Sequence, residues 1–113
     1  MREMRIEETK KTKITLTYDD YIKIAKTITY YFKEQEREGQ AENGIKQSDV
    51  VNWFVQQNLD NIQSLEQADQ LAKITHSVIQ RLIAQEKVLI ILRDDPDYKE
   101  RILQLHPNHV ESL

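Results

Sequence analysis

Three stretches of the chain carry apolar residues at steps of three and four positions, the spacing that places side chains on one face of a helix. The first stretch begins near Thr17, because Thr17 followed by Asp20 has the form of an N-cap with an acid three residues on. The apolar pattern of this stretch ends before Gly39, and glycine favours the end of a helix. The predicted apolar stripe consists of Tyr21, Ile24, Ala25, Ile28, Tyr31 and Phe32.

Two further helices are predicted after the polar loop that follows Gly39. The second spans about residues 48–58 with Ser48 as its cap, and the third opens at Ser64, which forms a capping box with Gln67. The expected inward positions of the second helix are Val51, Phe54 and Val55, flanked by Val50 and Trp53. Those of the third helix are Leu71, Ile74, Val78 and Leu82, reinforced by Ile79 and Ile83.

The rest of the chain favours short strands. Ile45 is a lone apolar residue suited to a very short strand, and residues 88–92 and 102–105 are apolar runs on either side of a turn rich in aspartate. Two such runs predict a β-hairpin. The order helix, short strand, helix, helix, hairpin is that of a winged helix, so the fold class is α+β, mostly helical, with a C-terminal β wing.

Length and charge refine this picture. The chain has 113 residues, enough for one domain, and its net charge is −3. Residues 1–13 lack a clean apolar period and are predicted to be a flexible tail or linker, with the winged-helix domain over 14–113. This tail has five basic and three acidic side chains, so the remainder carries −5 and is a poor start for autonomous duplex binding.

Candidate catalytic and metal patterns fail on their spacing. Two glycines, Gly39 and Gly44, precede Lys46, but a phosphate loop needs lysine directly after the second glycine and must follow a strand. His106 and His109 supply too few ligands for zinc in a chain without cysteine. The aspartates at 94–97 lack the closing glutamate of a calcium loop. We therefore predict no enzyme activity, cofactor or metal, and no apolar run reaches the length of a membrane span.

Two surfaces are candidates for binding macromolecules. The connection before the third helix places apolar and acidic residues together, a composition that suits a basic amphipathic helix. Alternatively, its apolar residues Ile62 and Leu65 only staple the third helix to the core. The candidate partner-binding residues are Leu59, Asp60, Ile62, Leu65, Glu66 and Asp69.

The other candidate surface is the expected solvent face of the third helix together with the wing, which in a helix-turn-helix can contact DNA. Few basic residues lie there, and neutralising two or three phosphates gives weak, strongly salt-dependent binding. DNA contact is thus expected to be weak or transient, and DNA binding is the alternative function. Its candidate residues are Lys73, His76, Gln80 and Arg93.

Several segments together resemble a known family. They are KQSDVVNWF at 46–54, VIQRL at 78–82, VLI at 88–90 and HPN at 106–108, with a helix start at Tyr18 and Tyr21. In this order and spacing they resemble the C-terminal domain of minichromosome maintenance (MCM) subunit six, over about residues 14–110. Family members are more acidic at the positions of Leu59 and Leu65 and have leucine at that of Ala68.

The resemblance implies a nuclear role in DNA replication licensing. The parent subunit of that family belongs to a hexameric DNA helicase, whose AAA+ ATPase lies upstream of this domain, and its other subunits are implied partners. The terminal winged helix of the family binds a basic helix of the licensing factor through the connection before the third helix and the start of that helix. A mainly structural role, in which the domain restrains the neighbouring ATPase ring, is a further alternative.

Overall fold

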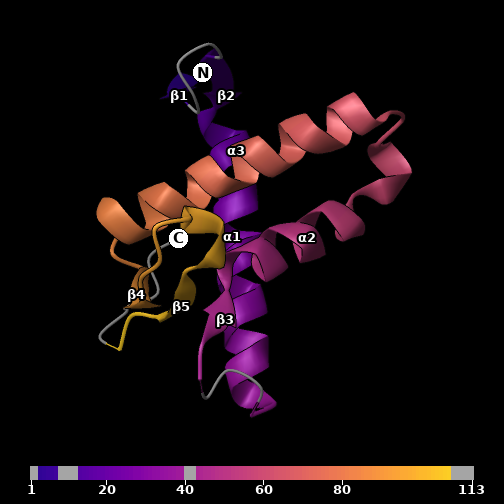
Figure 1. Ribbon diagram of the computed structural model, residues 1–113. Helices are drawn as coiled ribbons and strands as arrows, with labels where there is room; N and C mark the ends of the chain where they lie inside the picture. The colour runs from indigo at the N-terminus through magenta and orange to yellow at the C-terminus, as the bar shows by residue number, and fades with distance from the viewer. Residues whose placement is uncertain (1–2, 8–12, 40–42, 108–113) are drawn as a thin grey trace.

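The computed structural model describes residues 3–7, 13–39 and 43–107 (Figure 1). Three helices dominate it, and Figure 1 shows the second and third running across the first and meeting at a turn far from the sheet. The helices are α1 (Tyr18–Arg37), α2 (Gln47–Gln57) and α3 (Leu65–Ala84), with 3-10 turns η1 (Leu59–Asn61) and η2 (Tyr98–Glu100). The strands are β1 (Glu3–Glu7), β2 (Lys13–Thr17), β3 (Ile45–Lys46), β4 (Leu89–Arg93) and β5 (Ile102–Leu105).

The helix caps follow the predicted residues in two cases out of three. The Thr17 hydroxyl accepts a hydrogen bond from the Asp20 N–H at 3.1 Å, and the Ser64 hydroxyl accepts one from the Gln67 N–H at 3.1 Å. The prediction that Ser48 caps α2 is wrong, because α2 already begins at Gln47. The Gln47 N–H instead donates to the Arg101 carbonyl at 2.8 Å, so the backbone beside the wing satisfies this helix end.

The predicted short strand and hairpin form one antiparallel sheet with the order β3-β5-β4. Its central strand places Leu103 opposite both Ile45 and Ile91, and Leu103 is fully buried. Gly44 adopts φ +81° just before β3, where a Cβ atom would lie 2.5 Å from Ile102 Cγ2. The predicted order of elements is confirmed, and glycine is required at this entry to the sheet.

The core lies between the three helices and the inner face of this sheet. Val50, predicted to flank the core, is fully buried, whereas Trp53 stays half-buried and stacks on Tyr31 with ring centroids 4.2 Å apart. The largest buried apolar side chains come from α1, α3 and the sheet and include Tyr21, Ile28, Phe32, Ile79, Leu82, Leu89 and Leu103.

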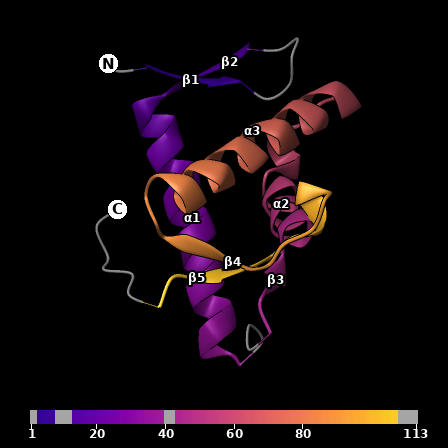
Figure 2. The same ribbon diagram turned by 60° about the vertical axis from the view of Figure 1, so that its left-hand side comes forward.

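The prediction of a flexible tail over residues 1–13 is wrong for the part that the structure describes. β1 pairs antiparallel with β2, with Met4 opposite Leu16 and Ile6 opposite Ile14. The alternation of apolar and polar residues in each strand is the signal that was missed, since two apolar residues are too few to establish a period. Figure 2 shows this hairpin and the three-stranded sheet on opposite sides of α3.

No helix among the described residues is long and apolar enough to cross a membrane.

Candidate interaction surfaces

The turn between α2 and α3 is held by local hydrogen bonds of its backbone and side chains. The Asn58 side-chain amide donates to the Phe54 carbonyl at 2.8 Å, and the Ile62 N–H donates to the Leu59 carbonyl at 3.0 Å. The Gln63 N–H donates to Gln67 Oε1 at 2.8 Å. In the predicted capping box, the Gln67 side chain would accept from the N–H of Ser64, one residue later. These bonds fix the turn and the first turn of α3 relative to each other. We call the six residues predicted to bind a partner, Leu59, Asp60, Ile62, Leu65, Glu66 and Asp69, the α2–α3 corner.

The apolar residues of the α2–α3 corner differ in burial. Leu65 is 90% exposed and Leu59 is 50% exposed, whereas Ile62 is half-buried. The alternative, in which Ile62 and Leu65 only pack α3 against the core, is therefore wrong for Leu65. Two leucines at this corner present apolar surface to solvent.

The three acids of the corner are all exposed. Asp69 forms an ion pair with Lys73 one turn further along α3, at 3.2 Å. Among the described residues, no ion pair engages Asp60 or Glu66. The carboxylates of Asp60 and Glu66 are thus open to a cationic partner.

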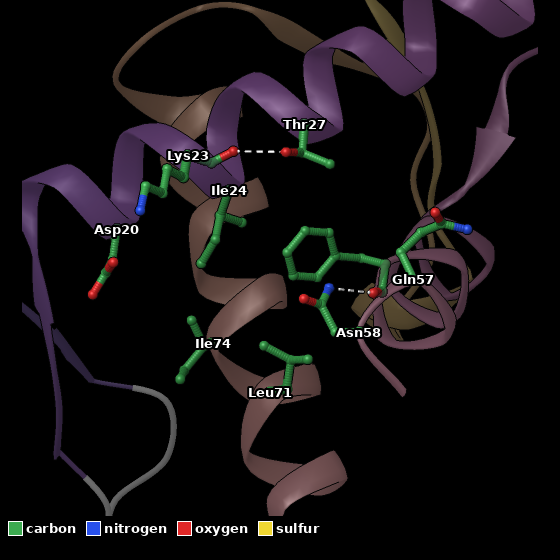
Figure 3. Close-up of a pocket in the computed structure, with 9 residues that line it drawn as sticks. Asp20, Lys23, Ile24, Thr27, Gln57, Asn58, Leu71 and Ile74 are labelled. Atoms are coloured by element: carbon green, nitrogen blue, oxygen red, sulfur yellow. Dashed lines mark hydrogen bonds between the residues drawn. The ribbon is translucent and has the colours of Figure 1, made fainter. Parts of the chain in front are cut away.

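A pocket that the sequence did not indicate lies next to this corner (Figure 3). It has a volume of about 450 Å³, and α1, α2 and α3 all contribute to its wall. Ile24, Phe54, Leu71 and Ile74 make it largely apolar, while Asn58 lies at its rim, directly before Leu59. The periodicity of each helix places these residues inward but does not show that the three helices leave a space between them.

The alternative DNA-binding residues do not form one open basic face. Lys73 is half-buried and paired with Asp69, and Gln80 accepts a hydrogen bond from Arg101 Nη2 at 3.2 Å. Arg93, at the end of β4, is exposed. His76 was expected on the solvent face of α3, and this expectation is wrong because His76 is buried.

His76 belongs instead to a polar network between α2, α3 and the wing. Arg101 Nη2 donates to Oε1 of the buried Gln47 at 2.9 Å, which orients the amide so that its Nε2 lies 3.0 Å from His76 Nδ1. In this orientation Nε2 donates and Nδ1 accepts. The ring of Tyr98 packs edge-on against His76 with centroids 5.1 Å apart. The network fixes the wing to the helices.

The rejected chemical motifs have ordinary structural places. The segment from Gly39 to Lys46 follows α1 and leads into β3, not from a strand into a helix, and residues 40–42 lie outside the described part. His109 also lies outside it. Within residues 3–7, 13–39 and 43–107, no group of three or more acidic or histidine side chains is arranged to hold a metal ion.

These elements in this order define a winged-helix domain: a helix-turn-helix built by α2 and α3, and a wing formed by β4 and β5. The sequence profile of the MCM6 C-terminal winged-helix domain matches residues 12–110, so the chain belongs to this family. The matched family is a winged-helix domain and not an ATPase core. The resemblance found in the sequence is confirmed.

Relatives with this domain carry the same family name. The DNA replication licensing factor mcm6 of Dictyostelium discoideum is 29% identical over 98 residues, which cover 86% of this chain and 11% of that protein. Mcm6 of Drosophila melanogaster is 28% identical over 115 residues, covering 88% and 14%. Mcm6 of Anopheles gambiae is 26% identical over 113 residues, with the same coverage. The chain thus spans only a small part of the length of the relatives it matches.

Proposed function

We propose that this domain docks the helicase-loading, or licensing, factor during assembly of the pre-replicative complex in the nucleus. The α2–α3 corner binds a basic amphipathic helix of that factor. The parent protein associates with the other MCM subunits, as the names of the relatives suggest. The role of this domain is association and not catalysis.

The observation that carries the proposal is the exposure of Leu65. A leucine that is 90% exposed in the first turn of a helix contributes almost nothing to the core of its own domain. Together with Leu59, which is 50% exposed, it can be buried by the apolar face of a partner helix. Such burial supplies affinity at roughly 25 cal/mol per Å² of apolar surface, before the entropic cost of association.

The acids of the corner attract and orient a basic partner as it approaches. Asp60 and Glu66 lie beside the two leucines in the chain and are exposed, in a chain of net charge −3. Opposite charges across an interface raise the association rate and select the orientation of the partner. A helix with lysine or arginine on the flanks of its apolar face therefore suits this corner.

The first test addresses the acids. Isothermal calorimetry would measure the affinity for a synthetic basic helix of the loading factor, with Glu66→Lys and Asp69→Lys combined in one variant. We expect binding about 10-fold weaker, or roughly 1.4 kcal/mol, with a flatter salt dependence and unchanged folding. The control variant, Glu86→Lys with Asp94→Lys, makes the same charge change at exposed acids far from the corner and should bind normally.

The second test addresses the leucines. Leu65→Ser should weaken binding by about 10-fold or more, because it removes the apolar contact. Leu92→Ser alters a leucine of the wing that is 46% exposed and should leave the affinity unchanged. Affinities that are unaffected by both corner variants would remove this surface as the docking site.

DNA binding through α3 and the wing has less support. Of its four candidate residues, His76 is buried and Lys73 is held in an ion pair. Only Arg93 remains as an exposed cation. One cation on an acidic domain gives little of the electrostatic attraction on which duplex binding depends.

A further inference from the structure

A basic segment lies on α1, and its first lysine, Lys23, also lines the pocket beside the α2–α3 corner. Residues 21–33 contain Lys23, Lys26 and Lys33 and no acid, and they are bounded by Asp20 and Glu34. The whole chain has net charge −3, so this uninterrupted positive segment contrasts with its surroundings. The proposed docking does not use these three lysines.

Helical geometry brings these lysines together around one aromatic ring. Lys23, Lys26, Tyr30 and Lys33 follow one another at steps of three, four and three residues, within an arc of roughly 80° at 3.6 residues per turn. We call these four residues the basic face of α1. The buried residues of the helix lie on the opposite side and are Tyr21, Ala25, Ile28, Thr29 and Phe32.

The side chains of this face are accessible. Lys23 and Lys26 are exposed, and Lys33 is half-buried. The side chain of Tyr30 is 60% exposed. Among residues 3–7, 13–39 and 43–107, the ion pairs join Glu34 with Arg37, Lys46 with Glu100, and Asp69 with Lys73. The ammonium groups of Lys23 and Lys26 are therefore open to an external anion.

We propose that the basic face of α1 binds a short stretch of single-stranded nucleic acid. Lys23 and Lys26 contact neighbouring phosphates, and the ring of Tyr30 stacks on a base. The face from Lys23 to Lys33 is about 15 Å long at 1.5 Å per residue, which accommodates a few phosphates. Lysines along the backbone combined with an aromatic ring for the bases are the usual elements of single-strand binding.

Tyr30 favours this ligand over the other polyanions. A duplex keeps the faces of its bases stacked inside, so the exposed ring would have no base to stack on. An acidic peptide would pair with Lys23 and Lys26 but gives the ring no matching group. The proposal is distinct from the docking function, because it concerns a different helix and the opposite charge, although Lys23 also lines the pocket beside the corner.

The test is a fluorescence anisotropy titration of the domain with a labelled oligo-dT of about 12 nucleotides, within the usual site sizes. Weak binding is expected, with a slope of log K against log salt of about −1.4, since Lys23 and Lys26 each contribute roughly 0.7. Lys23→Glu with Lys26→Glu should weaken binding by about 10-fold or more at low salt. Tyr30→Ala should weaken it by about 5-fold or more, while Tyr30→Phe retains it, because both aromatic rings stack.

Matched variants separate this surface from the other two. Arg93→Glu with Lys99→Glu makes the same charge change on exposed cations of the wing and its connection, and Glu66→Lys alters the corner. The wing variant should bind the oligonucleotide nearly as well as the unchanged domain does, and Glu66→Lys should bind it at least as well. Thermal unfolding of each variant shows that it is folded.

Four results would overturn the proposal: no binding at low salt, loss of binding in the wing variant instead of the α1 variant, tighter binding of duplex than of oligo-dT, or equal competition by polyglutamate. The last two would assign the face to a duplex or to an acidic protein. None of the four bears on the docking helix, whose affinity is measured separately.

Discussion

The two halves of α3 differ in how far their apolar side chains are buried. In the second half Val78, Ile79 and Leu82 are fully buried, and His76 is tied to the wing through Gln47. In the first turn Leu65 is 90% exposed. The same apolar residue types therefore hold the fold at one end of the helix and face solvent at the other. A helix that extends beyond its core can present a partner surface at little cost in stability.

The largest contrast is expected for truncation of one leucine in each half. Leu82→Ala should lower the free energy of unfolding by about 2–5 kcal/mol, because it leaves a cavity in the core. Leu65→Ala should change it by less than about 0.5 kcal/mol, as surface substitutions usually do. Urea denaturation of the two variants measures both values. A cost at Leu65 close to that at Leu82 would show that the corner is part of the core.

The polar network offers a second contrast. Gln47→Leu should cost about 1–3 kcal/mol, because it removes one buried hydrogen bond of His76 and one of Arg101. Gln56→Leu, on the exposed side of the same helix, is the control and should be close to neutral. Denaturation curves would measure both. Equal stabilities would mean that the network does not hold the wing to α3.

The smallest effect at neutral pH is expected at Tyr21, which packs under Arg81 of the second half of α3, 5.4 Å from its ring centroid. Burial raises the pKa of the Tyr21 hydroxyl above its usual value of 10.0, more than the neighbouring Arg81 lowers it. The folded state thus holds its proton more tightly than the unfolded state. This contribution is present below pH 10.0 and is lost as the pH rises through the folded pKa.

Tyr21→Phe should therefore leave stability unchanged or slightly higher near neutral pH and reduce its loss above pH 10.0. A small gain is expected because the hydroxyl is buried without a hydrogen-bond partner among the described residues. Urea denaturation at neutral and alkaline pH measures both effects. Parallel pH profiles for the variant and the unchanged domain would assign the alkaline loss to another group.

Much of the fold could be predicted because local rules agree with the global structure. Thr17 and Ser64 cap their helices as expected, and the apolar runs at 88–92 and 102–105 form the wing. The errors arise where contacts between residues that are distant in the sequence determine the local structure. Ser48 does not cap α2 because the backbone at Arg101 serves the helix start. His76 is buried because Gln47 and Tyr98 cover a helix face that periodicity assigns to solvent.

The candidate site was only partly predictable for the same reason. The position of the corner, apolar and acidic residues before α3, follows from the sequence. Whether Leu65 packs inward or faces outward does not, because it depends on how far α1 and the sheet extend along α3. The pocket beside the corner likewise arises from the spacing of three helices. The apolar periodicity identifies the faces of each helix, and the packing of the helices and the sheet decides which of these faces are buried.

We propose the α2–α3 corner as the docking surface of this domain. An NMR titration of the isotope-labelled domain with the basic helix of the loading factor measures where that helix binds. We expect amide shift changes confined to residues 59–70, with the second half of α3 unaffected. Changes centred on residues 73–81 and the wing, or none at saturating peptide, would contradict it.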